Sequence, residues 1–184
     1  MSEHIDHGFI KDLLDEKYEK YNRKDFIETD PISVPHQFSG KNDIEIAGFF
    51  ASVFAWGNRA AILKKTNVLM QMMENEPYEF LLNSSERDFH RLKPFVYRTF
   101  NHSDLVVFLC SLKRIILKYG SIGNCFEELF NKRKNVLNLL SDFHILFFQG
   151  VAEQHAYKHL SNPLKGSAAK RMNMYLRWMV RKDN

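Results

Sequence analysis

Apolar residues recur at helical spacing along most of the chain. Near the N-terminus, Phe9, Leu13, Leu14, Tyr18 and Tyr21 follow one another mostly at steps of three or four residues. This spacing predicts an amphipathic helix with a charged outer face. No run alternates with the period of two that a half-buried strand requires. The pattern predicts an all-α fold, an irregular or orthogonal array of about eight to ten helices.

The strongest helix signal runs from about residue 42 to residue 56. Asn42 or Asp43 can cap its N-terminus, and after the first turn nearly every position is apolar. This helix is therefore expected at the centre of the fold. Gly57 and Asn58 end it, and another helix is expected over residues 59–73.

The remaining segments have their own helix and turn signals. Asp30-Pro31 and Val34-Pro35 favour turns, so residues 25–41 are expected to form a linker or a packed loop. Ser103-Asp104 opens a clear helix for which Gly120 is a fitting C-cap. Short helices and turns are expected over 77–100, 124–130 and 136–148. We expect one domain over 1–184, with an N-terminal helix over 1–24 and the helical core over 42–184.

The charge is concentrated at the two ends of the chain. The 184 residues carry a formal net charge of +4. Residues 1–30 hold 5 basic and 9 acidic side chains, whereas residues 158–184 hold 7 basic and 1 acidic. This asymmetry suggests an anionic partner for the C-terminal segment, and a solvated helix face is the alternative.

Several classes of protein are not indicated. Two separated cysteines, Cys110 and Cys125, make neither a disulfide framework nor a zinc site. There is no signal peptide, and the longest apolar run, residues 46–56, is too short to span a bilayer. No P-loop or other glycine-rich phosphate motif is present. We expect a cytoplasmic protein without a membrane contact and without a bound cofactor.

The C-terminal block has the spacing that most suggests chemistry. Gly166 permits a tight turn, and Ser167 can cap a helix whose first turn is Ala168-Ala169-Lys170. A helix N-terminus beside Lys165 and Lys170 is suited to holding a phosphate. The residues expected to bind the phosphate are Lys165, Gly166, Ser167, Arg171, Asn173, Arg177 and Arg181.

The helical wheel of this block separates two faces. The cations Lys170, Arg177 and Arg181 fall in one narrow stripe with Asn173 at its edge. The opposite face is expected to be core and carries Ala168, Ala169, Met172, Leu176, Met179 and Val180. An ordinary terminal helix with solvated basic residues is the alternative.

Lys170 has a second possible role, as an amine nucleophile. Nearby cations such as Lys165, Arg171 and Arg177 would lower its pKa and favour the neutral amine. Such an amine can form a Schiff base with a sugar carbon. The plain reading is a structural lysine in the first turn of a helix.

Two histidines have a spacing that metal ligands use. His155 and His159 are four residues apart and can share one helix face. No third ligand stands at an obvious offset in the sequence, so surface or core histidines are expected.

The segment from Gly166 to Arg181, Gly-Ser-Ala-Ala-Lys-Arg-Met-Asn-Met-Tyr-Leu-Arg-Trp-Met-Val-Arg, resembles the signature of the DUF2400 family of uncharacterised bacterial proteins. The stretches from Asp43 to Ala51 and from Trp56 to Arg59, and Tyr119-Gly120-Ser121-Ile122, resemble that family more loosely. The family is distantly similar to the helix-hairpin-helix DNA glycosylases (HhH-GPD).

This resemblance implies a function and a gap in the site. Lys170 matches the position of the catalytic lysine in archaeal 8-oxoguanine glycosylases, which flip a damaged base and cleave its glycosidic bond with the help of an aspartate. The resemblance places that aspartate beyond Asn184, so we expect a chain truncated before it. The leading hypothesis is a DNA-binding, glycosylase-like protein. A non-catalytic module that binds nucleic acid or protein is the alternative, and an exposed apolar edge left by truncation would favour a dimer.

Overall fold

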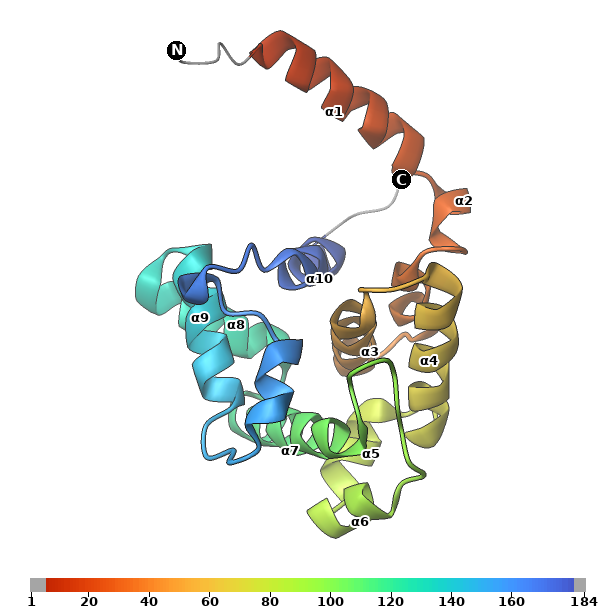
Figure 1. Ribbon diagram of the computed structural model, residues 1–184, viewed down its shortest axis with the longest axis vertical. Helices are drawn as coiled ribbons and strands as arrows, with labels where there is room; N and C mark the ends of the chain where they lie inside the picture. The colour runs from red at the N-terminus through yellow and green to blue at the C-terminus, as the bar shows by residue number, and fades with distance from the viewer. Residues whose placement is uncertain (1–5, 181–184) are drawn as a thin grey trace.

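The computed structural model describes residues 6–180, apart from the side chains of residues 24 and 25, and within that range the fold is all-α. Figure 1 shows helices packed at varied angles around a central one. The all-α prediction is confirmed. The α-helices are α1 His7–Tyr21, α2 Lys24–Ile27, α3 Lys41–Phe54, α4 Arg59–Met72, α5 Pro77–Asn83, α6 Glu86–Arg91, α7 His102–Tyr119, α8 Ile122–Arg133, α9 Val136–Phe147 and α10 Lys170–Val180. Short 3-10 helices are η1 Pro31–Ser33, η2 Pro35–Gln37, η3 Gln154–His159 and η4 Pro163–Lys165.

Helix α3 forms the centre of the core, as its apolar sequence predicts. Every residue from Glu45 to Phe54 is buried. α3 packs against α4, α5, α8 and α10, and the two proline-led 3-10 helices η1 and η2 also contact it. The Phe49 ring is fully buried and meets the rings of five neighbours, Phe50, Phe108, Phe143, Phe147 and Tyr175. Aromatic rings from four different helices therefore meet on one side of α3.

The predicted start of α3 is wrong by one or two residues. The helix begins at Lys41 with Gly40 as its N-cap, and no side chain caps it. The Asp43 carboxylate instead accepts a hydrogen bond from the backbone N–H of Tyr78 at 2.9 Å. A tertiary contact with the start of α5 thus takes the side chain that local chemistry assigns to capping.

The predicted start of α7 is also corrected. Its N-cap is Asn101, whose side chain accepts from the Asp104 N–H at 3.0 Å, while Asp104 accepts from the Asn101 N–H at 2.8 Å. This reciprocal pair is a capping box with an aspartate at the third helical position. The C-terminal prediction is confirmed, because Gly120 caps α7 with a φ of 81°.

Helix α1 differs from the rest of the molecule because none of its residues is buried. It extends away from the packed helices in Figure 1. Its apolar stripe, Phe9, Ile10, Leu13, Leu14, Tyr18 and Tyr21, is at least 40% exposed at every position. In the 25–41 segment, by contrast, Ile32 and Val34 are buried. The core therefore begins near Asp30, whose carboxylate accepts a hydrogen bond from the Ile32 N–H.

Nothing in the described residues resembles a membrane span. No helix there is both long enough and apolar enough to cross a bilayer.

Candidate functional site

The helix of the C-terminal block begins later than the sequence predicts. Ser167 does not cap the turn Ala168-Ala169-Lys170, because α10 begins only at Lys170. The Ser167 hydroxyl accepts a hydrogen bond from the Ala169 N–H at 3.1 Å, two residues on. Ala169 itself has a φ of 47°, which the right-handed helix does not allow. Gly166, at a φ of 81°, ends the preceding 3-10 turn.

Several of the residues predicted to hold a phosphate are exposed in this block. Lys165, Lys170 and Arg177 are exposed, and Lys170 and Arg177 are two helical turns apart on α10. Within the described residues no ion pair involves any of these three cations. Asn173 is also exposed, and its amide donates to the Ala168 carbonyl at 3.2 Å. We call Lys165, Lys170, Asn173 and Arg177 the basic surface.

Arg171 does not belong to this surface. It is half-buried, and its Nη1 donates a hydrogen bond to the carbonyl of Val53 near the end of α3. Burial lowers the pKa of this guanidinium below its usual range. Arg181, the last of the predicted phosphate ligands, lies outside the described residues.

The apolar face of α10 is only partly the one that the wheel predicts. Ala169 and Met172 are buried as expected, but Ala168 is exposed and Val180 is 76% exposed. Tyr175, which the prediction left out, is fully buried between Phe49 and Phe126. The late start of α10 moves Ala168 out of the helix. Val180 is the last residue of α10.

Next to the basic surface is a shallow groove of about 310 Å³. Two lysines, Lys158 and Lys165, line it together with Ser167 and Asn162. His144 lies on its inner wall, where burial, and then the charge of Lys165, lower the pKa of the imidazole. At neutral pH the groove therefore carries two positive charges and a neutral histidine.

Lys170 is accessible to a ligand. It is exposed in the first turn of α10. A lysine becomes a nucleophile at neutral pH when burial or close cations disfavour its charged form. Among the described residues no carboxylate lies within ion-pair distance of Lys170.

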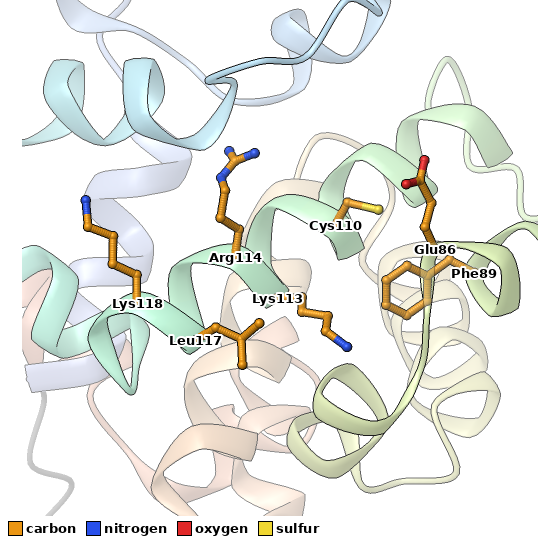
Figure 2. A pocket seen from close by; sticks show the side chains of 7 residues that line it. All are labelled: Glu86, Phe89, Cys110, Lys113, Arg114, Leu117 and Lys118. Atoms are coloured by element: carbon orange, nitrogen blue, oxygen red, sulfur yellow. The ribbon is translucent and has the colours of Figure 1, made fainter.

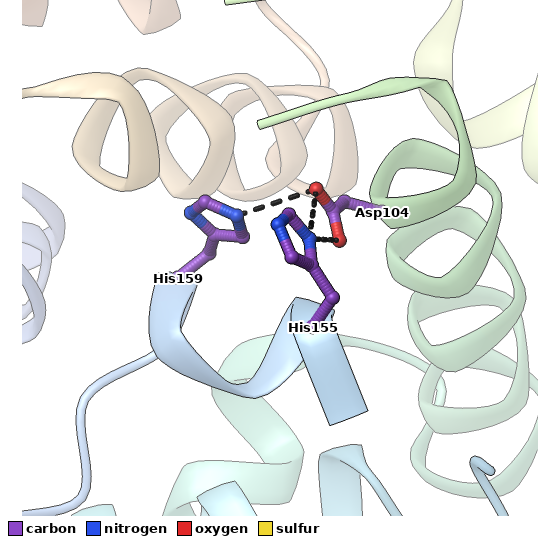
Figure 3. A group of neighbouring side chains, drawn as sticks. All are labelled: Asp104, His155 and His159. Atoms are coloured by element: carbon purple, nitrogen blue, oxygen red, sulfur yellow. Dashed lines mark hydrogen bonds and ion pairs between the residues drawn. The ribbon is translucent and has the colours of Figure 1, made fainter. Parts of the chain in front are cut away.

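A second constellation lies where α7 begins. His155 and His159 both belong to η3, and Asp104 of α7 lies against them, as Figure 3 shows. Nδ1 of His155 is 2.8 Å from Oδ1 of Asp104, and Nε2 of His159 is 3.3 Å from its Oδ2. Sequence reasoning found the two histidines by their spacing and missed the carboxylate. Asp104 is 51 residues from His155, so no local pattern could find it.

The three side chains differ in their surroundings. Asp104 is fully buried, His159 is 3% exposed, and the side chain of His155 is 39% exposed. Nε2 of His155 faces Nζ of Lys158 at 2.7 Å. A charged lysine can only donate, so Nε2 accepts and Nδ1–H donates to Asp104 in this arrangement. Burial lowers the pKa of His159, although the charge of Asp104 opposes that shift.

The connector between α3 and α4 lies near this constellation. Asn58 caps α4 by accepting from the N–H groups of Ala60 and Ala61. The guanidinium of Arg98 lies over the Trp56 ring at 4.8 Å. The Trp56 ring is 6.3 Å from that of His159. The connector therefore lies against His159 through the Trp56 ring.

A further concavity, shown in Figure 2, lies between α6 and α7 and contains Lys113, Arg114 and Cys110. Two of its three cations, Lys113 and Arg114, already have backbone partners. Lys113 donates to the carbonyls of Leu82 and Ser84, and Arg114 donates to those of Leu146 and Phe147. These groups satisfy carbonyls at the ends of α5 and α9, so they hold helices together.

Fold and site together define a helical domain with a basic surface at the start of its last described helix. The family described as "Protein of unknown function (DUF2400)" matches residues 30–184, so the chain belongs to that family. The family predicted from the C-terminal block is therefore confirmed. No curated protein and no solved structure matches the chain.

Proposed function

We propose that this domain binds DNA through its phosphate backbone, and that the basic surface makes the contact. The observation that carries the proposal is the set of exposed cations Lys165, Lys170 and Arg177, which have no ion-pair partner among the described residues. Exposed cations without an ion-pair partner attract a polyanion.

The neighbouring groove extends this charge. Lys158 and Lys165 line it. The first backbone N–H groups of α10, beside Lys170, have no partner within the helix. Backbone N–H groups and lysines contact phosphates without reading bases. The proposed binding is therefore independent of sequence.

The test is fluorescence anisotropy with a labelled DNA duplex at several salt concentrations. Binding should weaken steeply with salt, with a logarithmic slope of about −0.9 for each phosphate contact. The triple variant Lys165→Ala, Lys170→Ala, Arg177→Ala should lose most of the affinity and flatten the slope by about three contacts. A matched triple variant at exposed cations elsewhere should keep both the affinity and the salt slope of the wild type. Its substitutions are Lys64→Ala, Arg87→Ala and Lys93→Ala. Equal losses in the two triple variants, or no binding at low salt, would refute the proposal.

Base excision is the second candidate, and it depends on Lys170 alone. The resemblance to DNA glycosylases matches this residue to a catalytic lysine, and its exposure leaves it accessible to a sugar. In that reaction the neutral amine nitrogen would attack C1′ of the sugar, and the glycosidic bond would break as the base leaves with one amine proton. Opening of the C1′–O4′ bond, with the second amine proton passing to O4′, would then give the Schiff base. Borohydride on a duplex with an abasic site would trap the adduct, and Lys170→Ala should abolish it. Binding without a trapped adduct would leave the protein as a DNA-binding module.

A further inference from the structure

We propose that Asp104, His155 and His159 bind a divalent transition-metal ion of the zinc class. The three residues come from two segments that meet only in the folded chain, the start of α7 and the 3-10 helix η3. The proposal does not depend on DNA binding, because none of these residues belongs to the basic surface.

The geometry of the donor atoms fits such an ion. One nitrogen from each histidine and a carboxylate oxygen all lie within 4.8 Å of one another. Zinc bonds of about 2.0–2.1 Å in a tetrahedral site put neighbouring donor atoms about 3.3 Å apart. The separation of His159 Nε2 from Asp104 Oδ2 is 3.3 Å, and His155 Nδ1 is 2.8 Å from Oδ1. A small outward movement of the exposed His155 ring would complete the set.

His159 supplies an independent indication of a ligand. Its Nε2 is buried, lies 3.3 Å from Oδ2 of Asp104 and makes no hydrogen bond. The lost hydration of this nitrogen is therefore not replaced by a hydrogen bond. Bound metal would use this nitrogen and would also neutralise the fully buried Asp104 carboxylate.

Neighbouring groups hold two of the three ligands, Asp104 and His159, in place without the metal. Asp104 is held by the N–H of Asn101 at 2.8 Å in the capping box of α7. The ring of His159 packs edge-on against Phe100 at 4.9 Å. Two imidazoles and one carboxylate are donors that zinc accepts, whereas magnesium prefers oxygen donors alone. Three protein ligands also leave a coordination position open to water or to a small ligand.

One neighbouring side chain, that of Lys158, disfavours binding of the metal ion. Lys158 places Nζ 2.7 Å from Nε2 of His155, so its charge disfavours a cation and its hydrogen bond favours the tautomer with a proton on Nδ1. Lys158 is exposed and can rotate into solvent when the metal displaces that proton. Lys158 is therefore expected to lower the affinity for the metal ion but not to prevent its binding.

The experiment measures Zn²⁺ binding by isothermal titration and the absorption of bound Co²⁺, using the whole chain. We expect one ion per chain at this site, and excess Mg²⁺ should not displace it. His155→Ala removes an exposed ligand and should weaken binding more than about 100-fold, since changes to groups that only support a ligand already cost ~10–100-fold. His159→Gln should lose the same ion while keeping a side chain of similar shape.

The control variant is His90→Ala, which removes a similarly exposed histidine on α6. It should bind Zn²⁺ as the wild type does, and Lys158→Met should bind it more tightly because a repelling charge is gone. The metal-free His155→Ala variant should still melt in one cooperative transition, at a lower temperature than the wild type because the buried Asp104 loses a hydrogen bond. A retained cooperative transition separates loss of a ligand from loss of the fold. Unchanged binding in His155→Ala, equal losses in His90→Ala, or displacement by Mg²⁺ would overturn the proposal.

Discussion

Arg171 at the start of α10 donates a hydrogen bond to the backbone carbonyl of Val53, 118 residues earlier in the chain. Val53 lies in the last turn of α3, where carbonyls have no partner within the helix. The guanidinium thus caps the central helix and attaches α10 to it. The contact also explains why one arginine of a basic block is directed inward.

Replacing Arg171 by Met should lower the free energy of unfolding by about 1–3 kcal/mol. The change leaves a buried carbonyl without its charged donor and keeps most of the apolar stem. Urea denaturation measures the loss. Arg177→Met, at an exposed position of the same helix, should stay within about 0.5 kcal/mol of the wild type. Equal effects of the two variants would show that the Val53 contact has no special role.

Gly123→Ala should destabilise the protein by about 1 kcal/mol, although alanine normally favours a helix over glycine by a similar amount. A Cβ at Gly123 would lie 2.7 Å from Oε1 of Glu45, whose other oxygen accepts from the Gly123 N–H at 2.9 Å. The added carbon would push a buried carboxylate off its donor. In a Glu45→Ala background the same change should become neutral or stabilising. Denaturation of the wild type, the two single variants and the double variant gives the coupling free energy between the two positions. Additive effects would contradict this account.

Both cysteines should react slowly with iodoacetamide. Burial, and to a smaller extent Glu86, raises the pKa of Cys110 to about 11, and burial raises that of Cys125 to about 12. At pH 8 the thiolate of Cys110 should be about 100-fold scarcer than that of an ordinary thiol with a pKa near 9. The rate should keep rising with pH to about 11, whereas the denatured chain should level off near 9. A plateau near pH 9 in the folded protein would contradict the prediction.

These raised pKa values also determine the direction in which stability changes with pH. The neutral thiols are favoured in the folded state, so their contribution to stability is complete below about pH 9. It falls as the pH rises through the folded values of about 11 and 12. Melting temperatures of the wild type and Cys125→Ala at pH 8 and pH 10.5 should converge as the pH rises.

Deleting residues 1–20 should change the melting temperature by less than about 2 °C. Within the described residues α1 has no buried side chain, and the family match begins at residue 30. The cut spares Tyr21, whose ring contacts Phe26, and Arg59, whose guanidinium lies over the same ring. Calorimetry of the two chains provides the measurement. A large fall in melting temperature would show that α1 is part of the folding unit.

Local sequence signals located most helices because their causes are local. The apolar run over α3 predicted a central helix, Asn58 predicted the start of α4, and Gly120 predicted the end of α7. Each of these features depends on side chains within one or two turns. The basic composition of the C-terminal block likewise suggested its exposed cations, and the resemblance of the segment from Gly166 to Arg181 to a family signature indicated the family to which the chain belongs.

Contacts between distant segments overrode local rules at several positions. Asp43 could cap α3 by local chemistry, yet it holds the N–H of Tyr78. Asp104 was expected only to open α7, and the fold also places it against His155 and His159. Ala169 takes a left-handed conformation that no helix propensity anticipates, and α10 therefore begins at Lys170.

The sequence by itself determined the helical class, the central helix and the basic charge of the C-terminal block, because periodicity and charge act over a few residues. The tertiary structure decided which cations of that block face solvent and which one, Arg171, binds Val53. It also brought a carboxylate to two histidines 51 and more residues away. Such meetings depend on how the helices pack around α3, and packing is a property of the whole chain.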